Sequence, residues 1–532
     1  MERRLSEFAR ETAFVRGENG GDPFLEDPLV TGMAYDSRAV KPGGCFFAVR
    51  GLHTDGHDFI ANAVERGASV VVHDREIPEG LRRGALFIRV PDSRLAMAPL
   101  SAAFYGHPSR RLIVTGVTGT EGKSTTVYLI YQFLRLLGKK AGFFSTVCYS
   151  LGDTALGGEK PNPEHQTTPE APEVQRLLFE MAENGAEYAV VEASSHGLSK
   201  KTGRLACVDF DAAVITNVAH EHLEFHGTWE QYRSDKANLF HSLDRAREGS
   251  GTGPLLEESF GVINADDKSA DYFAGATERR TFTYSVEGRD ADLSLMAIES
   301  SPWGNWYEVL IRSEGTVTDI RDQLPGAFNA GNVLAALLAV SRLLSIPVRE
   351  IIPLAARLKP VRGRMTAVSR GQPFEVLVDY AHTPSSFTAV FPPFRERLDK
   401  TGGRIISLFG SAGERDTKKR SEQGRIASDY SDIIILADED PRGEVPMDIL
   451  EEIAAGVHGH ARGEDLFLIP DRPLAIRKAL SLAREGDIVL LLGKGHENSI
   501  IYADSPVPYD EIGETEKALE ELFPRHRKHS SS

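Results

Sequence analysis

The sequence predicts an α/β fold with three domains, because two features typical of parallel sheets recur along it. Short runs rich in β-branched residues alternate with longer helical patterns over most of the 532 residues, as expected for βαβ units. Six apolar runs also end in polar or glycine-rich clusters, at 189–197, 212–222, 376–384, 405–416, 433–442 and 488–497. Polar residues follow many strands because loops are solvated, but open parallel sheets bind ligands at the carboxyl ends of their strands. Six such clusters therefore favour a binding site.

The chain divides into three blocks, each with its own runs of expected strands. We expect a small N-terminal α/β domain over 1–109, with strands near 45–49, 68–73 and 85–90. A central domain with a P-loop-type parallel sheet follows over 110–358, and a Rossmann-like C-terminal domain covers 359–532. A polar stretch at 247–259 reads as an inserted loop, and the basic tail from about 525 to 532 is expected to be disordered.

Composition and charge exclude several classes of protein. The 61 basic and 77 acidic residues give a net charge of −16, which is unfavourable for general binding to nucleic acid or anionic membranes. The three cysteines are far apart and form no CxxC, so neither a disulfide framework nor a cysteine-ligated zinc is expected. The N-terminus lacks the apolar core of a cleaved signal, and no run approaches the ~18 apolar residues of a membrane span. We therefore expect a cytoplasmic monomer that acts on small molecules.

A glycine-rich loop is the strongest local signal. The segment TGTEGKSTT at 118–126 follows the expected strand at 111–117 and precedes a helical stretch. Its glycines allow the backbone and the helix N-terminus to surround phosphate oxygens, while a lysine adds positive charge and a serine can bind Mg²⁺. The spacing G-x-x-G-K-S is shorter than the common P-loop, and a structural glycine turn is the alternative. The expected nucleotide-binding residues of this loop are Gly119, Thr120, Glu121, Gly122, Lys123, Ser124 and Thr125.

A second group of candidate metal ligands follows two other strands. Glu192 ends one expected strand, and His220, Glu221, His222, Glu224 and His226 follow the next. A carboxylate and an imidazole on adjacent strand ends could share Mg²⁺, which a neighbouring phosphate loop would require. A zinc site of the form His-x-His-x3-His and a solvated polar cluster are the alternatives.

With these residues in view, the chain resembles the Mur ligases, an ATP-dependent family that builds the peptide of bacterial cell-wall precursors. The resemblance covers nearly the whole length and rests on motifs that occur in family order: TGTEGKSTT, VEASSHGL, HEHLEFHGT with the lysine of KANLF, PGAFNAGNVLAA, GRM, DYAHTP, FGSAGERD and GKGHE. YDSRAVKPGGCFFAVRG and DGHDFI in the N-terminal block resemble the branch that adds a diamino acid to UDP-N-acetylmuramoyl-L-alanyl-D-glutamate.

The resemblance implies roles for residues outside the phosphate loop. Lys123 would serve the ATP phosphates and Ser124 a first Mg²⁺, while Glu192 and His222 would bind a second Mg²⁺. Lys236 would be carbamylated and would orient metal as N6-carboxylysine, completing the catalytic set Lys123, Glu192, His222 and Lys236. The expected nucleotide contacts from elsewhere in the chain are Asn329, Arg364, Asp379 and His382.

The same resemblance implies a site for the UDP-linked substrate. Ser37 would lie against the UDP moiety, helped by the loop near His53. Gln166 stands where the family often has Asn, and the interval from Gly197 to Arg204 is longer than usual. The expected contacts to the muramoyl peptide are Gln166, Thr167, Thr168, Ser194 and Arg204.

The residues implied for the added amino acid give opposing indications. The family's Asp-Asn-Pro-Arg motif reads Glu439-Asp440-Pro441-Arg442 here, and the other expected contacts are Arg415, Gly493 and Glu497. Arg442 suits a distal carboxylate and favours meso-diaminopimelate, whereas the extra charge of Asp440 favours lysine or ornithine. The choice stays open at this stage. Two further departures are Glu121, where the family usually has Asn, and Tyr509-Asp510-Glu511-Ile512 in place of Asp-Asp-Arg.

Three other functions compete with this interpretation. Folylpolyglutamate synthetase shares the core but lacks the N-terminal UDP-binding block. A P-loop NTPase switch would hydrolyse nucleotide without an acyl acceptor. A non-catalytic relative should have lost Lys123, Glu192, His222 or Lys236, and all four are present.

Overall fold

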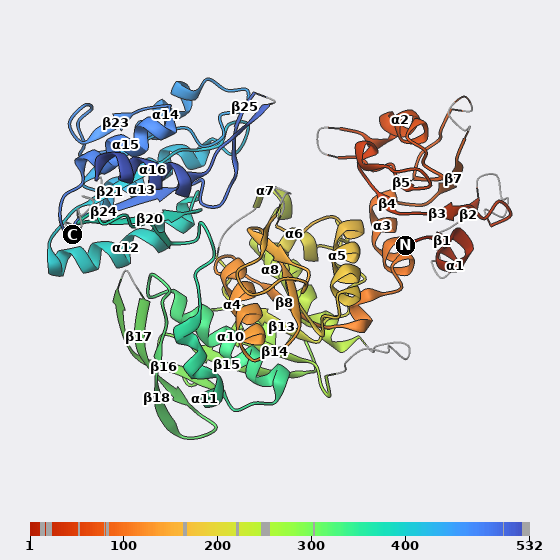
Figure 1. Cartoon of the computed structure of the whole chain (residues 1–532), viewed down its shortest axis with the longest axis horizontal. Coiled ribbons are helices and arrows are strands. Elements are labelled where there is room, and N and C mark those ends of the chain that lie inside the picture. Colours follow the sequence, from red (N-terminus) through yellow and green to blue (C-terminus); the bar gives the residue numbers. More distant parts are fainter. Residues whose placement is uncertain are drawn as a thin grey trace, which may run out of the picture. The chain divides into compact units, whose positions relative to one another are not determined.

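The structure is a computed structural model that describes residues 1–10, 16–17, 24–51, 54–78, 80, 84–162, 167–219, 223–245, 256–301, 304–503 and 505–523. The chain falls into two compact units (Figure 1). The first comprises residues 1–218, 222–284 and 335–346, and the second comprises 219–221, 285–334 and 347–532. Both are α/β, which confirms the expected fold class. The three-domain boundaries stay a prediction, and the expected tail and most of the expected loop at 247–259 lie outside the described residues.

The N-terminal part of the first unit contains a five-stranded sheet in the order β2-β7-β6-β5-β4. Its three central strands coincide with the runs expected from the sequence. Helix α2 covers one face of the sheet, while α1 and α3 cover the other. The bounds are β1 Arg3–Arg4, α1 Leu5–Ala9, β2 Arg16–Gly17, β3 Leu29–Val30, β4 Met33–Ala34, β5 Cys45–Phe47, α2 Ile60–Glu65, β6 Val70–His73, β7 Leu86–Arg89 and α3 Ser93–Phe104.

The rest of the first unit is built on strands in the order β11-β10-β9-β12-β8-β13-β14-β15. Strands β9 to β15 in this order run parallel, whereas β10 and β11 pair antiparallel at the edge, so the sheet is mixed. Helices α5, α8 and α9 pack on one face, and α4 also packs on this sheet. The bounds are β8 Ile113–Thr118, α4 Lys123–Leu136, β9 Ala141–Phe144, β10 Cys148–Ser150, β11 Lys160–Pro161, α5 Ala171–Glu183, β12 Tyr188–Glu192, α6 Ser195–Leu198, β13 Ala212–Ile215, α7 Leu223–His226, α8 Trp229–His241, β14 Phe260–Asn264, α9 Ala270–Ala274 and β15 Arg280–Ser285.

The second unit contains an antiparallel meander and a six-stranded sheet in the order β19-β20-β24-β21-β22-β23. All strands of this sheet except β19 are parallel. The bounds are β16 Leu293–Ser301, β17 Gly304–Ile311, β18 Thr316–Arg321, α11 Val348–Ile351, β19 Thr366–Ala367, β20 Glu375–Asp379, α12 Pro384–Thr401, β21 Ile405–Phe409, α13 Lys418–Tyr430, β22 Ile433–Leu436, α14 Pro446–Ala454, β23 Leu466–Leu468, α15 Arg472–Leu482, β24 Ile488–Leu492, β25 Ser499–Tyr502, β26 Ser505–Pro508 and α16 Glu511–Leu522. Helix α10, Asn329–Leu344, begins in the second unit, and its residues from 335 onward belong to the first.

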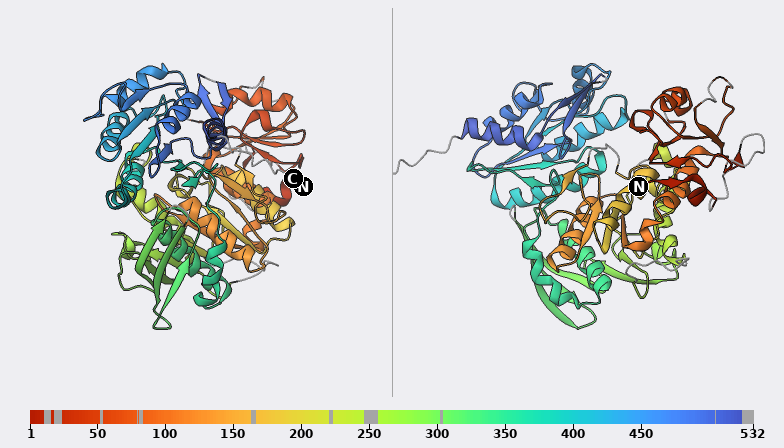
Figure 2. Two further views of the ribbon diagram at one scale, coloured as in Figure 1. Left: turned by 60° about the vertical axis from the view of Figure 1, so that its left-hand side comes forward. Right: turned by 45° about the vertical axis from the view of Figure 1, so that its right-hand side comes forward.

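Side-chain alternation along β24 explains why both faces of this sheet are covered by helices. Val489 and Leu491 pack with α15 and α16, whereas Leu490 and Leu492 pack with α12, α13 and α14. Figure 2 shows these helices beside the strands in two further views. Because both faces are apolar, the polar residues that follow β20, β21, β22 and β24 gather at one edge of the sheet.

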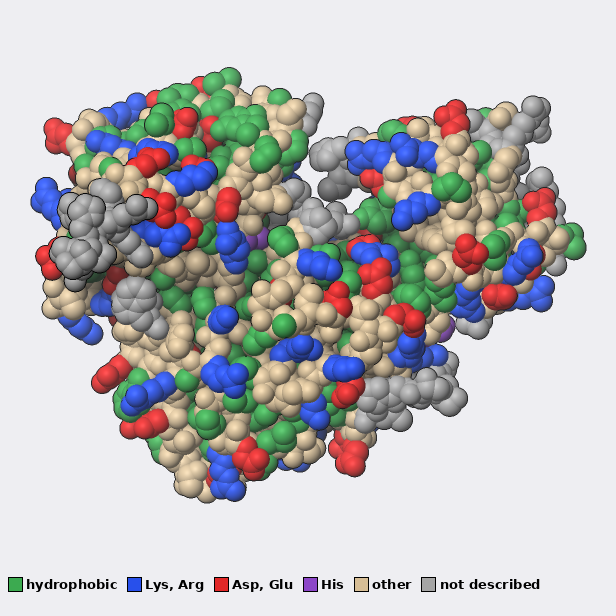
Figure 3. All heavy atoms as spheres, in the orientation of Figure 1, with side chains coloured by type: hydrophobic (Ala, Val, Ile, Leu, Met, Phe, Trp, Pro, Cys, Tyr) green, Lys and Arg blue, Asp and Glu red, His purple; other side chains and the backbone are tan. Residues whose placement is uncertain are grey.

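Basic and acidic side chains are interspersed on the face shown in Figure 3. None of the described helices is by itself long and apolar enough to cross a membrane. In the part of the chain that the structure describes, one helix pair, α10 with Val348–Arg357, meets that test of length and composition, and this pair is bent by 111°.

Candidate functional site

The phosphate loop joins β8 to α4 and can be formed only with glycine at its first position. Gly119 has φ +150°, and a Cβ added there would lie 1.8 Å from Oγ1 of Thr216. Gly122 precedes α4 with φ +80°. The strand next to β8 fixes the loop between these glycines, because the carbonyl of Asn217 accepts from Thr120 N at 2.8 Å. The main chain is therefore held in the close turn that a phosphate cradle requires.

Two ammonium groups reach carbonyl oxygens of this loop. Lys123 Nζ donates to Thr120 O at 2.7 Å, and Lys236 Nζ donates to Gly119 O at 2.6 Å. Lys236 is 1% exposed and lies 4.3 Å from the centre of the Tyr232 ring. With the N-terminus of α4, the two cations make this edge of the first unit favourable for an anion.

Glu192 lies beside the phosphate loop and accepts hydrogen bonds from two neighbouring segments. Its Oε2 atom accepts from Ser124 Oγ and from Thr146 N, both at 2.8 Å. Its Oε1 atom accepts from Thr146 Oγ1 at 3.1 Å, and the residue is 1% exposed. A hydroxyl and a carboxylate in direct contact are hard oxygen donors of the kind that Mg²⁺ prefers.

The histidine cluster is described only in part. His220, Glu221 and His222 lie outside the described residues, so the second expected magnesium ligand is not placed. His226 is buried, with Nδ1 2.8 Å from Asp235 and Nε2 3.1 Å from Ser195 Oγ. Both of its ring nitrogens are thus engaged, which argues against the zinc alternative. Over the residues placed by the structure, no three His, Cys, Asp or Glu side chains are grouped to hold a metal.

Three residues expected to contact the muramoyl peptide lie together next to Glu192. Thr168 Oγ1 donates to the carbonyl of Glu192 at 2.9 Å and lies 2.9 Å from Ser194 Oγ. Arg204 Nη1 donates to Thr168 O at 2.8 Å, and its Nη2 donates to Glu170 Oε1 at 2.8 Å. Glu170 was not predicted from the sequence. Its carboxylate neutralises Arg204, so Arg204 orders this segment as well as contributing positive charge.

The other expected contacts to the UDP-linked substrate are placed less fully. Ser37 is buried in a short 3₁₀ helix, Ser37–Ala39, which begins after Asp36. Thr167 is half-buried beside Thr168. His53 and Gln166 lie outside the described residues. Their roles stay predictions.

The nucleotide contacts expected from elsewhere in the chain belong to the second unit. The Arg364 guanidinium lies 4.7 Å from the centre of the Tyr380 ring, and His382 Nδ1 is 2.8 Å from Tyr380 O. Asp379 accepts from the main-chain N–H of Met365 at 2.8 Å. Burial and the Lys419 ammonium lower the pKa of His382 to about 4, so this ring is neutral at pH 7.

Asn329 begins α10, and its side chain is engaged locally. Its Nδ2 donates to Pro325 O at 2.7 Å, and its Oδ1 accepts from Asn332 Nδ2 at 3.0 Å. These bonds fix the amide at the start of the helix, and its contact with nucleotide stays a prediction.

Residues expected to bind the added amino acid meet at the ends of β22 and β24. Asp440 Oδ1 accepts from Lys494 Nζ and from Ile501 N, both at 2.9 Å. Lys494 Nζ also lies 2.5 Å from Glu497 Oε2. Burial by itself would lower the pKa of Lys494, but the neighbouring carboxylates of Glu497 and Asp440 outweigh burial and raise this pKa. The ammonium is therefore charged and lies between two carboxylates.

The remaining members of this group differ in exposure. Glu439 is buried and lies against Gly493, whereas Arg415 is exposed. Arg442 follows Pro441 with φ +56°, and its main-chain N–H donates to Ile501 O at 2.9 Å. This bond ties the end of β22 to β25.

A buried ion pair that the sequence did not suggest supports the same strand ends. Arg472 and Glu511 are 0% exposed, and two hydrogen bonds of 2.8 and 2.7 Å join them. Arg472 also donates to Asp438 O at 3.0 Å and to Leu492 O at 2.7 Å. Glu511 belongs to the tetrapeptide Tyr509-Asp510-Glu511-Ile512, which stands where the family has Asp-Asp-Arg. That difference was the only feature of the sequence that drew attention to Glu511.

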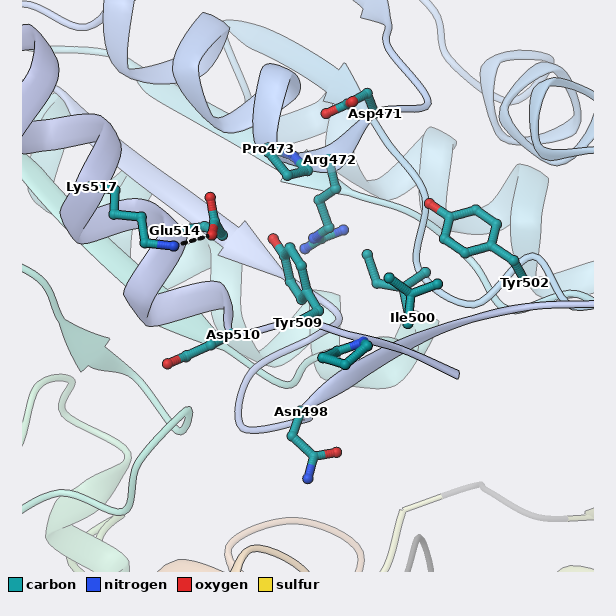
Figure 4. Close-up of a pocket in the computed structure, with 12 residues that line it drawn as sticks. Asp471, Arg472, Pro473, Asn498, Ile500, Tyr502, Tyr509, Asp510, Glu514 and Lys517 are labelled. Atoms are coloured by element: carbon teal, nitrogen blue, oxygen red, sulfur yellow. Dashed lines mark hydrogen bonds and ion pairs between the residues drawn. The ribbon is translucent and has the colours of Figure 1, made fainter. Parts of the chain in front are cut away.

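A cavity of about 540 Å³ lies between the β25–β26 hairpin and the starts of α15 and α16. Figure 4 shows the Arg472 side chain extending toward the Tyr509 ring inside it. Tyr502, also in its wall, donates to Asp438 Oδ2 at 2.9 Å, and burial raises the pKa of Asp438 to about 6. None of the residues expected to bind substrate lines this cavity. Its lining is Asp471, Arg472, Pro473, Asn498, Ile500, Tyr502, Val507, Pro508, Tyr509, Asp510, Glu514 and Lys517.

Comparison with known proteins places this geometry in a family. Residues 29–105 match the model described as Mur ligase family, catalytic domain; residues 117–340 match the Mur ligase middle domain; and residues 363–495 match the Mur ligase glutamate ligase domain. A UDP-N-acetylmuramyl-tripeptide synthetase of Treponema denticola is 51% identical over 92% of this chain and 94% of its own.

Two further relatives are named by the reaction that they catalyse. A UDP-N-acetylmuramoyl-L-alanyl-D-glutamate–2,6-diaminopimelate ligase of Geobacillus thermodenitrificans is 37% identical over 93% of this chain and 96% of its own. A solved structure of a ligase with the same name is 28% identical, with a TM-score of 0.59 over 93% of this chain and 95% of that one. The chain therefore belongs to the Mur ligase family of ATP-dependent ligases.

Proposed function

We propose that this enzyme joins a diamino acid to the D-glutamate γ-carboxylate of UDP-N-acetylmuramoyl-L-alanyl-D-glutamate, with ATP converted to ADP and phosphate. One observation carries the proposal. The side chain of Glu192 accepts from Ser124 of the phosphate loop, while its main-chain carbonyl accepts from Thr168 of the expected acceptor site. The residues assigned to nucleotide and to acceptor thus meet at a single position.

The reaction consists of two steps, a phosphoryl transfer from ATP to the substrate carboxylate and an acyl transfer from the acyl phosphate to the amine. A γ-carboxylate oxygen of the substrate attacks the terminal phosphorus of ATP, and ADP leaves. The amine then attacks the carbonyl carbon of the acyl phosphate, and phosphate departs with the former carboxylate oxygen as the tetrahedral intermediate collapses. The first step brings two anions together. Lys123 and the N-terminus of α4 reduce their repulsion, and Thr168 and Ser194 orient the acceptor.

Magnesium belongs to this proposal as the ion expected at the phosphate loop. Two such ions are expected. Ser124 would hold the first, Glu192 and His222 would hold the second, and the carbamylated Lys236 that the family resemblance implies would orient metal. The contact between a hydroxyl and a buried carboxylate fits a hard cation. When bound, the ion supplies charge neutralisation at the phosphate oxygens.

Two observations favour this function over its rivals. A folylpolyglutamate synthetase would not account for the match of residues 29–105 to a Mur ligase model. An NTPase switch would not account for Thr168 being bonded at once to Glu192, Ser194 and Arg204.

The test is phosphate release from ATP in the presence of the UDP-dipeptide and, separately, lysine, ornithine and meso-diaminopimelate. We expect release to require both the UDP-dipeptide and an amino acid, and the product mass to show one new amide. Phosphate release at the same rate without the UDP-dipeptide would contradict the proposal and favour the NTPase switch.

A further inference from the structure

A buried carboxylate connects the N-terminal sheet to the expected acceptor site. Glu170 precedes α5 and is 6% exposed, and its Oε1 atom accepts from two guanidinium groups. Arg94 Nη1 donates to this atom at 3.1 Å, and Arg204 Nη2 donates to it at 2.8 Å. Burying a carboxylate is unfavourable unless cations compensate its charge, so Glu170 holds both arginines close to each other.

Arg94 extends this contact to the N-terminal sheet. Its Nη2 atom donates to the carbonyl of Arg50 at 3.0 Å, and the neighbouring Ser93 Oγ donates to Ala48 O at 2.7 Å. Both carbonyls follow β5, in the segment GGCFFAVRG that resembles the UDP-binding block of the family. The first two residues of α3 are therefore fixed to the part of the chain that is expected to bind UDP.

Arg204 extends the contact in the opposite direction. Its Nη1 atom donates to Thr168 O at 2.8 Å, and Thr168 Oγ1 donates to Glu192 O at 2.9 Å. The side chain of Glu192 accepts from Ser124 of the phosphate loop at 2.8 Å. A continuous series of hydrogen-bonded residues thus runs from the end of β5 to the phosphate loop, and Glu170 joins its two halves.

Apolar packing links the same elements. Ala171, next to Glu170, belongs to the hydrophobic core between the N-terminal sheet and α3, and Phe179 of α5 packs against that core. The rings of Phe179 and Tyr105 lie 5.4 Å apart. Because close-packed interiors transmit strain, a shift of α3 would move the start of α5 and, with it, the carboxylate that holds Arg204.

We propose that Glu170 is a positioning residue that couples the UDP-binding block to the acceptor site, so that the UDP group of the substrate raises turnover as well as affinity. This inference rests on the proposed function. UDP is remote from the reacting carboxylate, and binding energy from a remote group can be used to orient the reacting atoms. The hydrogen bonds described above give that energy a route from the end of β5 to Thr168, with Glu170 at its centre.

The test compares the UDP-linked dipeptide with N-acetylmuramoyl-L-alanyl-D-glutamate, the same acceptor without UDP. ATP is saturating, and the amino acid is whichever of lysine, ornithine and meso-diaminopimelate supports turnover. We expect the wild-type kcat to be higher with the UDP-linked acceptor by about 5- to 150-fold, the usual range of coupling between two sites. Glu170→Gln should lower this ratio by about 2- to 30-fold, the range for residues between coupled sites, by lowering kcat for the UDP-linked acceptor.

Further variants separate coupling from a general loss of structure. Arg94→Met breaks the bond to the N-terminal sheet and leaves Arg204 in place, so it should lower the ratio as Glu170→Gln does. The double variant should lower the ratio no further, because both substitutions interrupt one series of bonds. Glu183→Gln, the same substitution at the other end of α5, removes an exposed ion pair with Arg111 and should leave the ratio unchanged.

Each outcome decides the inference. A wild-type kcat that is the same with and without UDP would overturn it without any variant. Equal losses of kcat toward both acceptors in Glu170→Gln would also overturn it, because that result indicates a local role beside Thr168. If Glu170→Gln fails to fold, the ratio in Arg94→Met decides, and an unchanged ratio there contradicts the coupling. Absence of ADP formation by the wild-type enzyme with the UDP-linked acceptor and every diamino acid would instead contradict the proposed function.

Discussion

Replacing Arg472 by Met should destabilise the carboxyl edge of the second unit's sheet far more than an ordinary surface substitution would. The guanidinium is fully buried and bonded to Glu511, Asp438 O and Leu492 O. Its removal leaves a buried carboxylate without a cation and two carbonyls without a donor. Breaking one side of a buried pair costs about 3–5 kcal/mol.

Hydrogen exchange followed by mass spectrometry measures this loss at the strands concerned. A loss of about 3–5 kcal/mol corresponds to exchange that is faster by roughly two to nearly four orders of magnitude in β22 and β24. The double variant Arg472→Met/Glu511→Leu should recover much of the protection, because apolar pairs often replace buried ion pairs without loss.

A matched control lies on the same helix. Arg477 pairs with Glu521 at 2.9 Å, and both side chains are substantially exposed, so Arg477→Met should cost about 0–1 kcal/mol. Equal effects of Arg472→Met and Arg477→Met would refute the reasoning, as would a double variant no more stable than Arg472→Met alone.

Three other substitutions test the site and its pH dependence. Lys236→Met should lower turnover at least about tenfold, because the variant loses the amine that carbamylation would convert into a metal-orienting carboxylate. Calorimetry should show UDP-substrate binding retained, and full turnover would refute a role for this lysine. Gly119→Ala should weaken ATP binding at least about tenfold in a titration because its Cβ meets Thr216, whereas Gly138→Ala, in open space, should not; equal affinities would contradict the described loop. Because the pKa of His382 is lowered to about 4, the unfolded chain binds the proton more readily between pH 6.5 and 4, so stability falls as pH falls through that window. Between pH 7 and 5, this effect should lower the free energy of unfolding by at most about 2 kcal/mol, and His382→Gln should abolish that part of the decrease in urea unfolding. An unchanged pH dependence in the variant would count against a lowered pKa of His382.

The strands that position the site could be predicted from the sequence because they are buried on both faces. Continuous apolar runs ending in polar clusters became β12, β13, β20, β21, β22 and β24. The mixed character of the first unit's sheet was not foreseen, since β10 is short and half-buried, β11 is short and exposed, and neither carries a continuous apolar run.

Contacts between distant residues were the part that could not be predicted. Lys236 reaches Gly119 across 117 positions, and nothing in its helical surroundings distinguishes it from a surface lysine. Arg472 and Glu511 likewise resemble surface residues of two helices, yet they are fully buried. The sequence suggested that the negative charge of Asp440 would favour a cationic amino acid. It did not show that Lys494 contacts Asp440, because the sequence does not reveal which side chains lie across a sheet edge.

The central claim is that the D-glutamate γ-carboxylate is phosphorylated before the amide forms, and transfer of an oxygen atom from that carboxylate to phosphate tests it most directly. The UDP-dipeptide is prepared with ¹⁸O in the D-glutamate γ-carboxylate and is turned over with ATP and a diamino acid. Attack of that carboxylate on the terminal phosphorus predicts one ¹⁸O atom in each phosphate released. Phosphate carrying only unlabelled oxygen would contradict the account, because the amide would then form without a phosphorylated acid.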